Sequence, residues 1–352
     1  MPVIDALRVN CHTIPTDEPE SDGTLEWDST TIVVVEASAG GQRGLGYTYG
    51  SVACAAFVSD KLESVVCGRD ALEVPAAWAA MRHAVRNEGI VGIAAMGIAA
   101  VDVALWDLAA RLHGVPLCTL LGRVHDAVPV YGSGGFCSYS DERLASQLGG
   151  WASAGFGRVK MKVGREPRAD DHRVRVAREA IGPAVELFVD GNGAYTRKES
   201  LAWAERFAEH GVTYFEEPVS SDDLEGLRLV RDRGPAGMAI AAGEYGYHLA
   251  YFERMIDCVD IQQADVTRCG GITGLLQVGA LCEAKGIPFS AHCAPAIHVH
   301  ACCAIGPLAH LEWFHDHVRI EHLLFDGAPI PQGGVVRPDL SRPGLGLELK
   351  SR

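Results

Sequence analysis

Long uncharged stretches are scarce in this chain of 352 residues. The least charged one covers residues 89–101, and Asp102 and Asp107 interrupt it before it reaches the roughly 20 residues that a membrane-spanning helix needs. The opening segment, Met-Pro-Val-Ile-Asp, has neither the basic region nor the apolar core of a secretory signal. We therefore expect no membrane span and a cytoplasmic protein.

Positive charge is also in short supply. The chain has 31 Lys and Arg residues against 45 Asp and Glu residues, and the net charge of −14 opposes nonspecific binding to nucleic acid and to anionic membranes. With 48% hydrophobic and 22% charged residues, the composition is that of a globular protein. We expect a small-molecule partner, with no nucleic acid and no membrane.

Paired cysteine motifs are absent. The 11 cysteines include no C-x-x-C pair, and Cys302 and Cys303 are direct neighbours. This pattern indicates neither a disulfide framework nor a cysteine zinc site. We expect reduced and mostly buried thiols.

The first 125 residues mix strand and helix signals. Residues 30–37 predict a strand, residues 40–46 form a glycine-rich turn, and residues 53–113 carry helical patterns. This mixture is typical of an α+β domain.

From residue 128 on, short apolar runs alternate with helix-length segments. A capping box, Thr196-Arg-Lys-Glu199, begins one of these helices, and Gly211 is its expected stop. A doubly wound sheet would alternate in the same way, but Tyr131-Gly-Ser-Gly-Gly-Phe136 does not match its G-x-G-x-x-G turn. We therefore predict a (β/α) barrel. The strand candidates are residues 128–131, 158–163, 185–190, 212–217, 238–242, 259–263, 287–290 and 310–314.

Two lysines lie on one predicted strand. Lys160 and Lys162 alternate with Val159, Met161 and Val163, so the strand period of 2 places both ammonium groups on the lumen face. Mutual repulsion and burial are expected to lower at least one of the two pKa values and to produce a base. A pair of solvated lysines on an edge strand is the alternative.

Three carboxylates end three successive predicted strands: Asp190, Glu216 and Glu244. Each is one βα unit from the next, so they are expected to converge at the mouth of the barrel. Carboxylate oxygens suit a hard divalent cation, with Mg²⁺ preferred and Mn²⁺ as the second choice. Pairing of each carboxylate with a nearby Lys or Arg is the alternative.

An acid–base pair is predicted farther along the chain. Asp265 and His292 follow neighbouring strands, and a carboxylate beside the imidazole would orient it as a general acid or base. Glu312 ends the last strand and is expected to reach a substrate carboxylate. The remaining histidines of this region lack such a strand-end context, and we predict no zinc cluster among His298, His300, His310, His315, His317 and His322.

Together these motifs resemble the enolase superfamily, and within it the mandelate racemase subgroup. The resemblance covers nearly the whole chain and includes an upstream helix and turn, residues 100–122. Its pieces are Lys160-x-Lys162, Asp190-Gly-Asn192, Glu216-Glu-Pro, Gly243-Glu244, Asp265 with the glycine-rich segment 270–274, and Ser290-Ala-His292. Each motif is weak alone, but their order and one-unit spacing are specific.

The resemblance implies an α+β capping domain with substrate-closing loops at 1–125, a modified (β/α)7β TIM barrel at 126–320, and a C-terminal segment at 321–352 that returns to the cap. It implies Asp190, Glu216 and Glu244 as Mg²⁺ ligands, with Lys162 and His292 as two bases. Asp265 would hold His292, Lys160 would help neutralise the enediolate, and Glu312 would act as an acid near the substrate carboxylate.

The implied chemistry is removal of the proton α to a carboxylate, through an enediolate. Residues 13–23 are polar and acidic, and we expect this segment and residues 40–50 to close over a polyhydroxy acid. Dehydration of an acid sugar to a 2-keto-3-deoxy acid by a hydro-lyase is the preferred reaction; a racemase, epimerase or cycloisomerase is the alternative. A catalytically silent binding module and a phosphosugar isomerase rank lower, and we expect a homo-oligomer.

Overall fold

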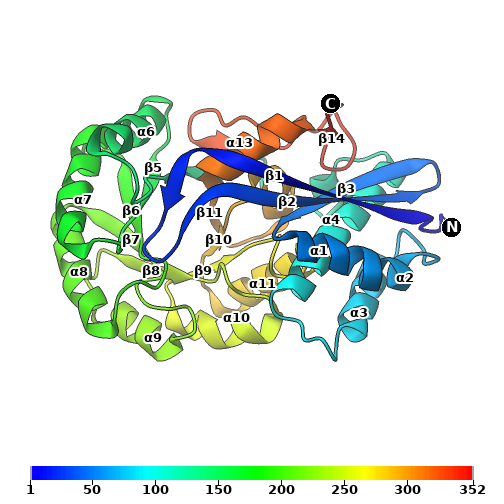
Figure 1. The fold of residues 1–352 in the computed structure, drawn as a ribbon, viewed down its shortest axis with the longest axis horizontal. Helices are drawn as coiled ribbons and strands as arrows, with labels where there is room; N and C mark the ends of the chain where they lie inside the picture. Colours follow the sequence, from blue (N-terminus) through cyan, green and yellow to red (C-terminus); the bar gives the residue numbers. More distant parts are fainter. Residues whose placement is uncertain (1, 351–352) are drawn as a thin grey trace.

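An antiparallel sheet and a group of helices form the N-terminal part of the chain in the computed structural model, which describes residues 2–350 (Figure 1). The strands β1 (Ala6–Ser21), β2 (Glu26–Ala39) and β3 (Gln42–Tyr49) pair in chain order. The helices are α1 (Val52–Phe57), α2 (Glu63–Val66), α3 (Val74–Ala84) and α4 (Ile93–His113), with a π turn at Val58–Leu62. The strand predicted at 30–37 lies inside β2, whereas β1 and β3 were not predicted.

The long helix α4 is the core of this cap. It packs on β3, where a Cβ at Gly44 or Gly46 would lie 2.2 Å from the carbonyl oxygen of Ala104 or Ala100, so only glycine allows this close approach. By length and composition α4 is a candidate membrane span, but 83% of its most apolar window is buried inside the protein. We therefore interpret α4 as a core helix.

Eight parallel strands close into a barrel, because β11 pairs with β4. All eight predicted strands are confirmed, and so is the barrel fold with an N-terminal cap. The short β13 (Val335–Val336) pairs in antiparallel orientation with Val128 and Pro129 at the start of β4. The barrel strands are β4 (Val128–Gly134), β5 (Arg158–Lys162), β6 (Glu186–Asp190), β7 (Val212–Glu216), β8 (Ala239–Ala242), β9 (Ile261–Ala264), β10 (Phe289–Ala291) and β11 (Leu308–Phe314).

One helix lies between each pair of consecutive strands, which is the (β/α)7β pattern. The capping box at Thr196 and Glu199 is confirmed at the start of α8, which ends at Glu209, just before the left-handed Gly211. The connecting helices are α6 (Asp141–Ser153), α7 (Pro167–Ile181), α8 (Arg197–Glu209), α9 (Leu224–Arg233), α10 (Leu249–Met255), α11 (Gly271–Lys285) and α12 (Pro295–Ala301). Short turns follow α10 at Ile256–Cys258 and α12 at Cys302–Ala304, while α5 (Leu117–Leu120) precedes the barrel.

The C-terminal segment runs back from the barrel to the cap (Figure 1). After α13 (His315–Leu324), β12 (Phe325–Asp326) pairs with β14 (Glu348–Leu349). The backbone N–H of Leu345 donates to Asp107 on α4, and Arg111 of the same helix pairs with Glu348 at 2.6 Å. The domain limits at residues 125 and 320 stay a prediction.

The hairpin of β1 and β2 extends from the cap across the barrel (Figure 1). The backbone N–H of Cys137, after β4, donates to the carbonyl of Ser21 at the end of β1. The loop between β1 and β2 therefore lies over the C-terminal mouth of the barrel, where the predicted site residues are.

Candidate active site

The predicted site residues lie at the C-terminal ends of seven barrel strands. On adjacent strands Lys162 pairs in register with Asp190, and Asp190 with Glu216. Glu244 comes two residues after β8, while Asp265 and His292 directly follow β9 and β10. Glu312 lies within β11, and the two lysines end β5. All eight side chains are buried, so the fold brings the whole predicted set together.

The carboxylates of Asp190, Glu216 and Glu244 form one cluster. Each offers an oxygen within 4.8 Å of the others. The Oε1 atom of Glu216 is buried and has no hydrogen-bond partner among residues 2–350. A buried carboxylate oxygen without a donor is costly unless something positive meets it. The donor set therefore fits a hard divalent cation, which prefers oxygen ligands.

Both lysines pair with these carboxylates. The Nζ atom of Lys160 lies 2.7 Å from Oε2 of Glu216 and 2.8 Å from Oε1 of Glu312, and Nζ of Lys162 lies 2.5 Å from Oδ2 of Asp190. Both side chains are buried, as expected for the lumen face, so the alternative of solvated lysines on an edge strand is wrong.

The expected lowering of a lysine pKa is also wrong. Burial alone would lower the pKa of Lys162, but the charge of Asp190 outweighs it and raises that pKa above its usual value. For Lys160, Glu216 and Glu312 likewise overcome burial and raise the pKa. The sequence argument weighed the two lysines against each other and left out the carboxylates that it had itself placed at the same barrel mouth. Pairing of Asp190 and Glu216 with these lysines, the alternative stated for the carboxylates, is present in the structure.

His292 and Asp265 form the predicted pair. The Nδ1 atom of His292 lies 2.8 Å from Oδ2 of Asp265, whose other oxygen accepts hydrogen bonds from the backbone and hydroxyl of Thr267. The Nε2 atom of His292 lies 2.8 Å from Oε2 of Glu244. Burial alone would raise the pKa of Asp265, but the hydrogen bond with His292 lowers it to about 2.

The surroundings also favour the charged imidazolium. Burial alone would lower the pKa of His292, but the facing carboxylates and the bond to Asp265 raise it well above its usual value. An imidazolium held on one side by a carboxylate is a suitable proton donor.

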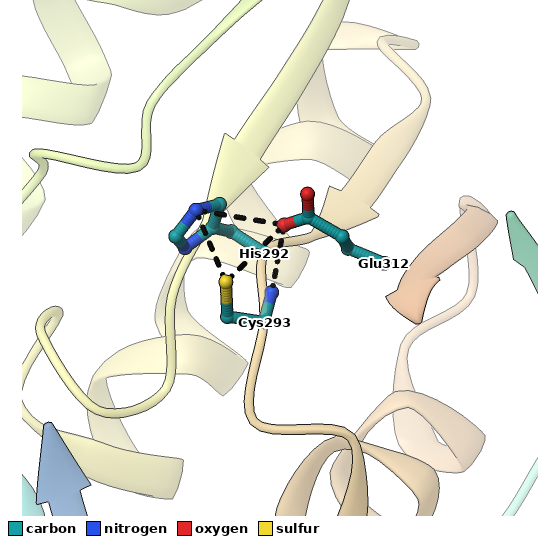
Figure 2. Close-up of side chains that lie close together, drawn as sticks. All are labelled: His292, Cys293 and Glu312. Atoms are coloured by element: carbon teal, nitrogen blue, oxygen red, sulfur yellow. Dashed lines mark hydrogen bonds and ion pairs between the residues drawn. The ribbon is translucent and has the colours of Figure 1, made fainter. Parts of the chain in front are cut away.

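Glu312 and Cys293 complete this corner of the site (Figure 2). Oε2 of Glu312 accepts a hydrogen bond from the backbone N–H of Cys293 at 3.1 Å and lies 3.5 Å from Nε2 of His292. Oε1 accepts a hydrogen bond from the Ser133 hydroxyl at 2.5 Å. The Cys293 thiol lies 3.3 Å from the same imidazole nitrogen, and burial raises its pKa, so the thiol is neutral.

Unusual backbone conformations gather at the barrel mouth. Among residues 2–350 the non-glycine residues with positive φ are Asn192, Glu217, Cys293 and Ala294, and each follows a strand that supplies a predicted site residue. The turn at 293–294 is supported by buried His298, whose Nδ1 is 2.7 Å from the Cys293 carbonyl oxygen while Nε2 accepts from the Val266 backbone N–H. A positive φ strains the backbone of a non-glycine residue, and such strain persists only where surrounding contacts impose it. Strained residues of this type are common at active sites.

A cavity of about 560 Å³ opens onto these groups, a size typical of small-ligand sites. From the barrel it is lined by Lys162, Glu244 and His292 among others, and from the cap by residues of the β1–β2 loop, β2 and β3. Of the segments expected to reach the substrate, residues 13–23 contribute Asp22 and residues 40–50 contribute Tyr49 and Gly50.

Sequence reasoning missed several residues of this site, among them Arg268, Cys293, Trp27 and His317. Arg268 lines the cavity and lies 3.7 Å from both Glu244 Oε1 and Asp265 Oδ2. Cys293, Trp27 and His317 also line it, and His317 had been set aside for lack of strand-end context. For Arg268 a signal was available, since it lies three residues after Asp265 in a loop that follows a strand.

Comparison with known proteins identifies the class of enzyme that this barrel and site define. Residues 10–122 match the family model described as the mandelate racemase/muconate lactonizing enzyme N-terminal domain, and residues 143–352 match the enolase C-terminal domain-like model. The chain therefore belongs to the mandelate racemase/muconate lactonizing enzyme family of the enolase superfamily, as the sequence motifs indicated.

Several relatives are named for reactions on sugar acids. The chain is 31% identical to the 3,6-anhydro-α-L-galactonate cycloisomerase of Streptomyces coelicolor, over 99% of this chain and 97% of that protein. It is 32% identical to the arabinonate dehydratase of Saccharolobus solfataricus, over 78% of this chain and 75% of that protein. The relatives thus include both dehydratases and cycloisomerases.

Solved structures share the whole fold. A mandelate racemase/muconate lactonizing enzyme-like protein from Rubrobacter xylanophilus matches with a TM-score of 0.98 and 63% identity, over 99% of this chain and 98% of that one. A racemase from Streptomyces coelicolor with bound magnesium matches with a TM-score of 0.93 and 30% identity, over 99% and 97%.

Proposed function

We propose that this protein removes the proton α to the carboxylate of a sugar acid and dehydrates it to a 2-keto-3-deoxy acid. The observation that carries the proposal is the placement of two proton-transfer groups around one carboxylate cluster. Lys162 contacts Asp190, His292 contacts Glu244, and both line the same cavity. A substrate carbon in that cavity would meet a lysine and an imidazole.

Magnesium is the proposed cofactor, held by Asp190, Glu216 and Glu244, with Mn²⁺ as the second choice. Support comes from the all-oxygen donor set, the partnerless Glu216 Oε1 and the magnesium bound in the related racemase. When bound, the ion supplies positive charge where negative charge develops on the substrate carboxylate.

Each proton transfer of the proposed reaction is assigned to a particular side chain. Lys162 or His292, in its neutral form, takes the α-proton, and the electron pair of that C–H bond enters the enediolate. The carboxylates that favour the charged forms include Asp190 and Glu244, whose charge a bound ion would compensate.

Lys160 adds positive charge beside the enediolate. Glu312 is a carboxylate paired with Lys160 in the structure, so its proposed role as an acid near the substrate carboxylate requires that it first takes up a proton. His292, held by Asp265, then protonates the β-hydroxyl as its C–O bond breaks, so that water leaves and the resulting enol becomes the 2-keto acid.

The test replaces His292 by Asn, which removes the proton donor but keeps a side chain of similar size. The variant and the wild type are incubated with Mg²⁺ and a panel of acid sugars in D₂O, and proton NMR measures α-deuterium exchange and keto-acid formation. We expect the variant to form no 2-keto acid, because hydroxide is a poor leaving group unless it is protonated.

Substrates that present the α-proton to Lys162 are expected to retain exchange in this variant. Wild-type turnover of the panel without any 2-keto acid would contradict dehydration. Undiminished keto-acid formation by His292→Asn would contradict the role of His292.

Cycloisomerisation or epimerisation is the second candidate. It is favoured by the cycloisomerase from Streptomyces coelicolor, which matches this chain over nearly its full length. Two bases around one carbon also permit return of a proton to the opposite face. The same NMR experiment distinguishes these reactions, because they yield inverted or ring-rearranged products and no keto acid.

We also propose a cytoplasmic homo-oligomer that binds a small carboxylate. All 11 cysteines are free and eight of them are buried, as the sequence predicted, and unpaired thiols suit a reducing compartment. The homo-oligomer stays a prediction, and light scattering, which measures the molar mass in solution, would test it.

A further inference from the structure

We propose that the substrate of this cavity carries a single carboxylate, as an aldonic acid does, and that aldaric diacids are poor substrates. The inference rests on the proposed function, because it assumes that one carboxylate occupies the barrel end of the cavity. It concerns what the opposite, cap-side wall can bind.

The cap-side wall offers no positive charge among the described residues that line the cavity. Its one charged side chain is Asp22, which is only 6% exposed. Oδ1 of Asp22 accepts hydrogen bonds from the backbone N–H groups of Thr24 and Leu25 and from the Thr24 hydroxyl, which fix the carboxylate in the β1–β2 loop. A second substrate carboxylate would face this fixed negative charge.

The cations on the barrel side already have anionic partners. Lys162 is paired with Asp190, and His292 lies between Asp265 and Glu244. The guanidinium of Arg268 lies 3.7 Å from each of Glu244 Oε1 and Asp265 Oδ2 and is stacked over the Tyr245 ring. A remote carboxylate would have to compete with these buried carboxylates for the same cations. With Asp190 and Glu244 engaged by an ion, Asp265 would still hold His292 and lie beside Arg268.

His317 does not supply the missing charge. Its ring is stacked on Tyr49 with centroids 3.4 Å apart, and Nδ1 faces the backbone N–H of Ala294. A ring nitrogen that accepts from a backbone N–H carries no proton of its own, so the imidazole is neutral. Burial accordingly lowers the pKa of His317 to about 3.

The wall instead matches neutral sugar hydroxyls and the apolar faces of sugar carbons. Thr30, Thr31 and Ser51 contribute hydroxyl groups, and Trp27 and Tyr49 contribute aromatic surface. A terminal CH₂OH can exchange hydrogen bonds with such groups, whereas a carboxylate moved out of water needs a counter-charge. Like charges across a binding site also disfavour the wrong ligand.

The experiment compares matched substrates that differ only at the remote carbon: D-galactonate with galactarate, D-gluconate with D-glucarate, and D-mannonate with D-mannarate. The enzyme with Mg²⁺ is assayed for keto-acid formation and for α-deuterium exchange in D₂O. We expect kcat/KM to be at least about tenfold higher for the aldonate in every pair that reacts, which is about 1.4 kcal/mol of discrimination.

Asp22→Asn tests the origin of this preference, because Asn keeps the Oδ1 acceptor of the loop and removes the charge. We expect it to lower the aldonate-to-aldarate ratio at least about threefold, roughly half of the tenfold free-energy difference. Asp28→Asn is the control and should leave the ratio unchanged, since Asp28 is an exposed neighbour that does not line the cavity.

If kcat/KM for an aldarate equals that for its aldonate partner, the inference is overturned while the proposed function stands. The same holds if Asp22→Asn has the same aldonate-to-aldarate ratio as the wild type. The aldonate-to-aldarate ratio of the wild-type enzyme tests the inference even if the Asp22→Asn variant folds poorly. Absence of α-deuterium exchange with every compound overturns both the inference and the proposed function.

Discussion

Individual charged residues at the barrel mouth are stabilised by one another. Lys160 is fully buried and touches Glu216, Glu312 and Asp190 within 3.3 Å, so its charge is compensated by three carboxylates. Burying ions is costly unless partners and hydrogen bonds surround them. Glu216 contacts Lys160 through one oxygen, while its other oxygen has no donor among residues 2–350, so its negative charge is only partly compensated by the protein.

Glu216→Gln is therefore expected to abolish magnesium-dependent activity while the fold remains. Gln fills the same space but removes the negative charge, so the affinity for Mg²⁺ should fall by roughly two orders of magnitude or more. Titration calorimetry with Mg²⁺ and the keto-acid assay measure the effect, and circular dichroism checks the fold.

Glu225→Gln, a change at an exposed carboxylate on α9, should alter neither quantity. Full activity of Glu216→Gln, or of the wild type after exhaustive chelation, would contradict the metal assignment.

The β1–β2 loop is the element that joins the cap to the site. Trp27 lines the cavity, donates from Nε1 to Oε2 of Glu20 at 2.8 Å and packs edge-on against Phe136 after β4. A Cβ at Gly23 would lie 2.7 Å from the carbonyl oxygens of both Gly191 and Val163. The loop therefore reaches the barrel mouth only because residue 23 has no side chain.

Gly23→Ala is expected to raise KM, because the added methyl group keeps the loop from seating on the barrel and leaves the cavity open to water. Thermal stability should change little, since the strain can be relieved by displacement of an exposed loop. Steady-state kinetics on the preferred substrate and thermal unfolding measure both effects.

Gly237→Ala serves as the control, because nothing lies within 4 Å of a Cβ at that exposed position. Unchanged kinetics in Gly23→Ala would show that seating of the loop does not contribute to substrate binding.

Across the whole molecule, buried carboxyl groups connect the cap to the rest of the chain. Asp102 on α4 accepts from the backbone and hydroxyl of Thr273 on α11. Glu321 on α13 accepts from the Tyr47 hydroxyl on β3 at 2.5 Å and from the backbone N–H of Ala296. Burial raises the pKa of Asp102 to about 7 and that of Glu321 to about 8.

These raised values predict that the contribution of Asp102 and Glu321 to the stability of the fold is lost between about pH 5 and pH 9. The pKa of Glu321 is higher in the folded chain than its ordinary value of 4.5, so the folded state holds the proton more tightly. The contribution is complete below about pH 4 and is lost as the pH rises through about 8. Each unit of pKa difference corresponds to roughly 1.4 kcal/mol, so loss of this one contribution would by itself lower Tm by several degrees.

Glu321→Gln removes this titration, and its Tm is expected to fall less than that of the wild type between pH 5 and pH 9. Calorimetric Tm values at both pH values, with Glu225→Gln as the control that keeps the wild-type slope, measure the difference. Equal slopes for wild type and Glu321→Gln would show that Glu321 does not take part in the linkage.

How far the sequence could predict this structure differs between the two parts of the chain. In the barrel, each buried strand is a short apolar run, so all eight strands were found. In the cap, β1 alternates exposed and partly buried residues and contains Pro15 and Pro19, and its character as a strand comes from pairing with β2. Such pairing is non-local and leaves little local signal.

The sequence by itself determined the family, the order of the barrel strands and the candidate residues at their ends, because parallel strands of a barrel expose their carboxyl ends at one mouth. Only the tertiary structure decided which of those charges meet. Closure of β11 against β4 brings Glu312 to Lys160 and to His292. Together with Glu216 beside Lys160 and Asp190 beside Lys162, this raises the pKa values of both lysines where a lower value was expected. The cap-side wall of the cavity also depends on the tertiary structure. Asp22, Trp27 and Tyr49 reach the cavity through sheet pairing and loop packing, which local sequence patterns do not predict.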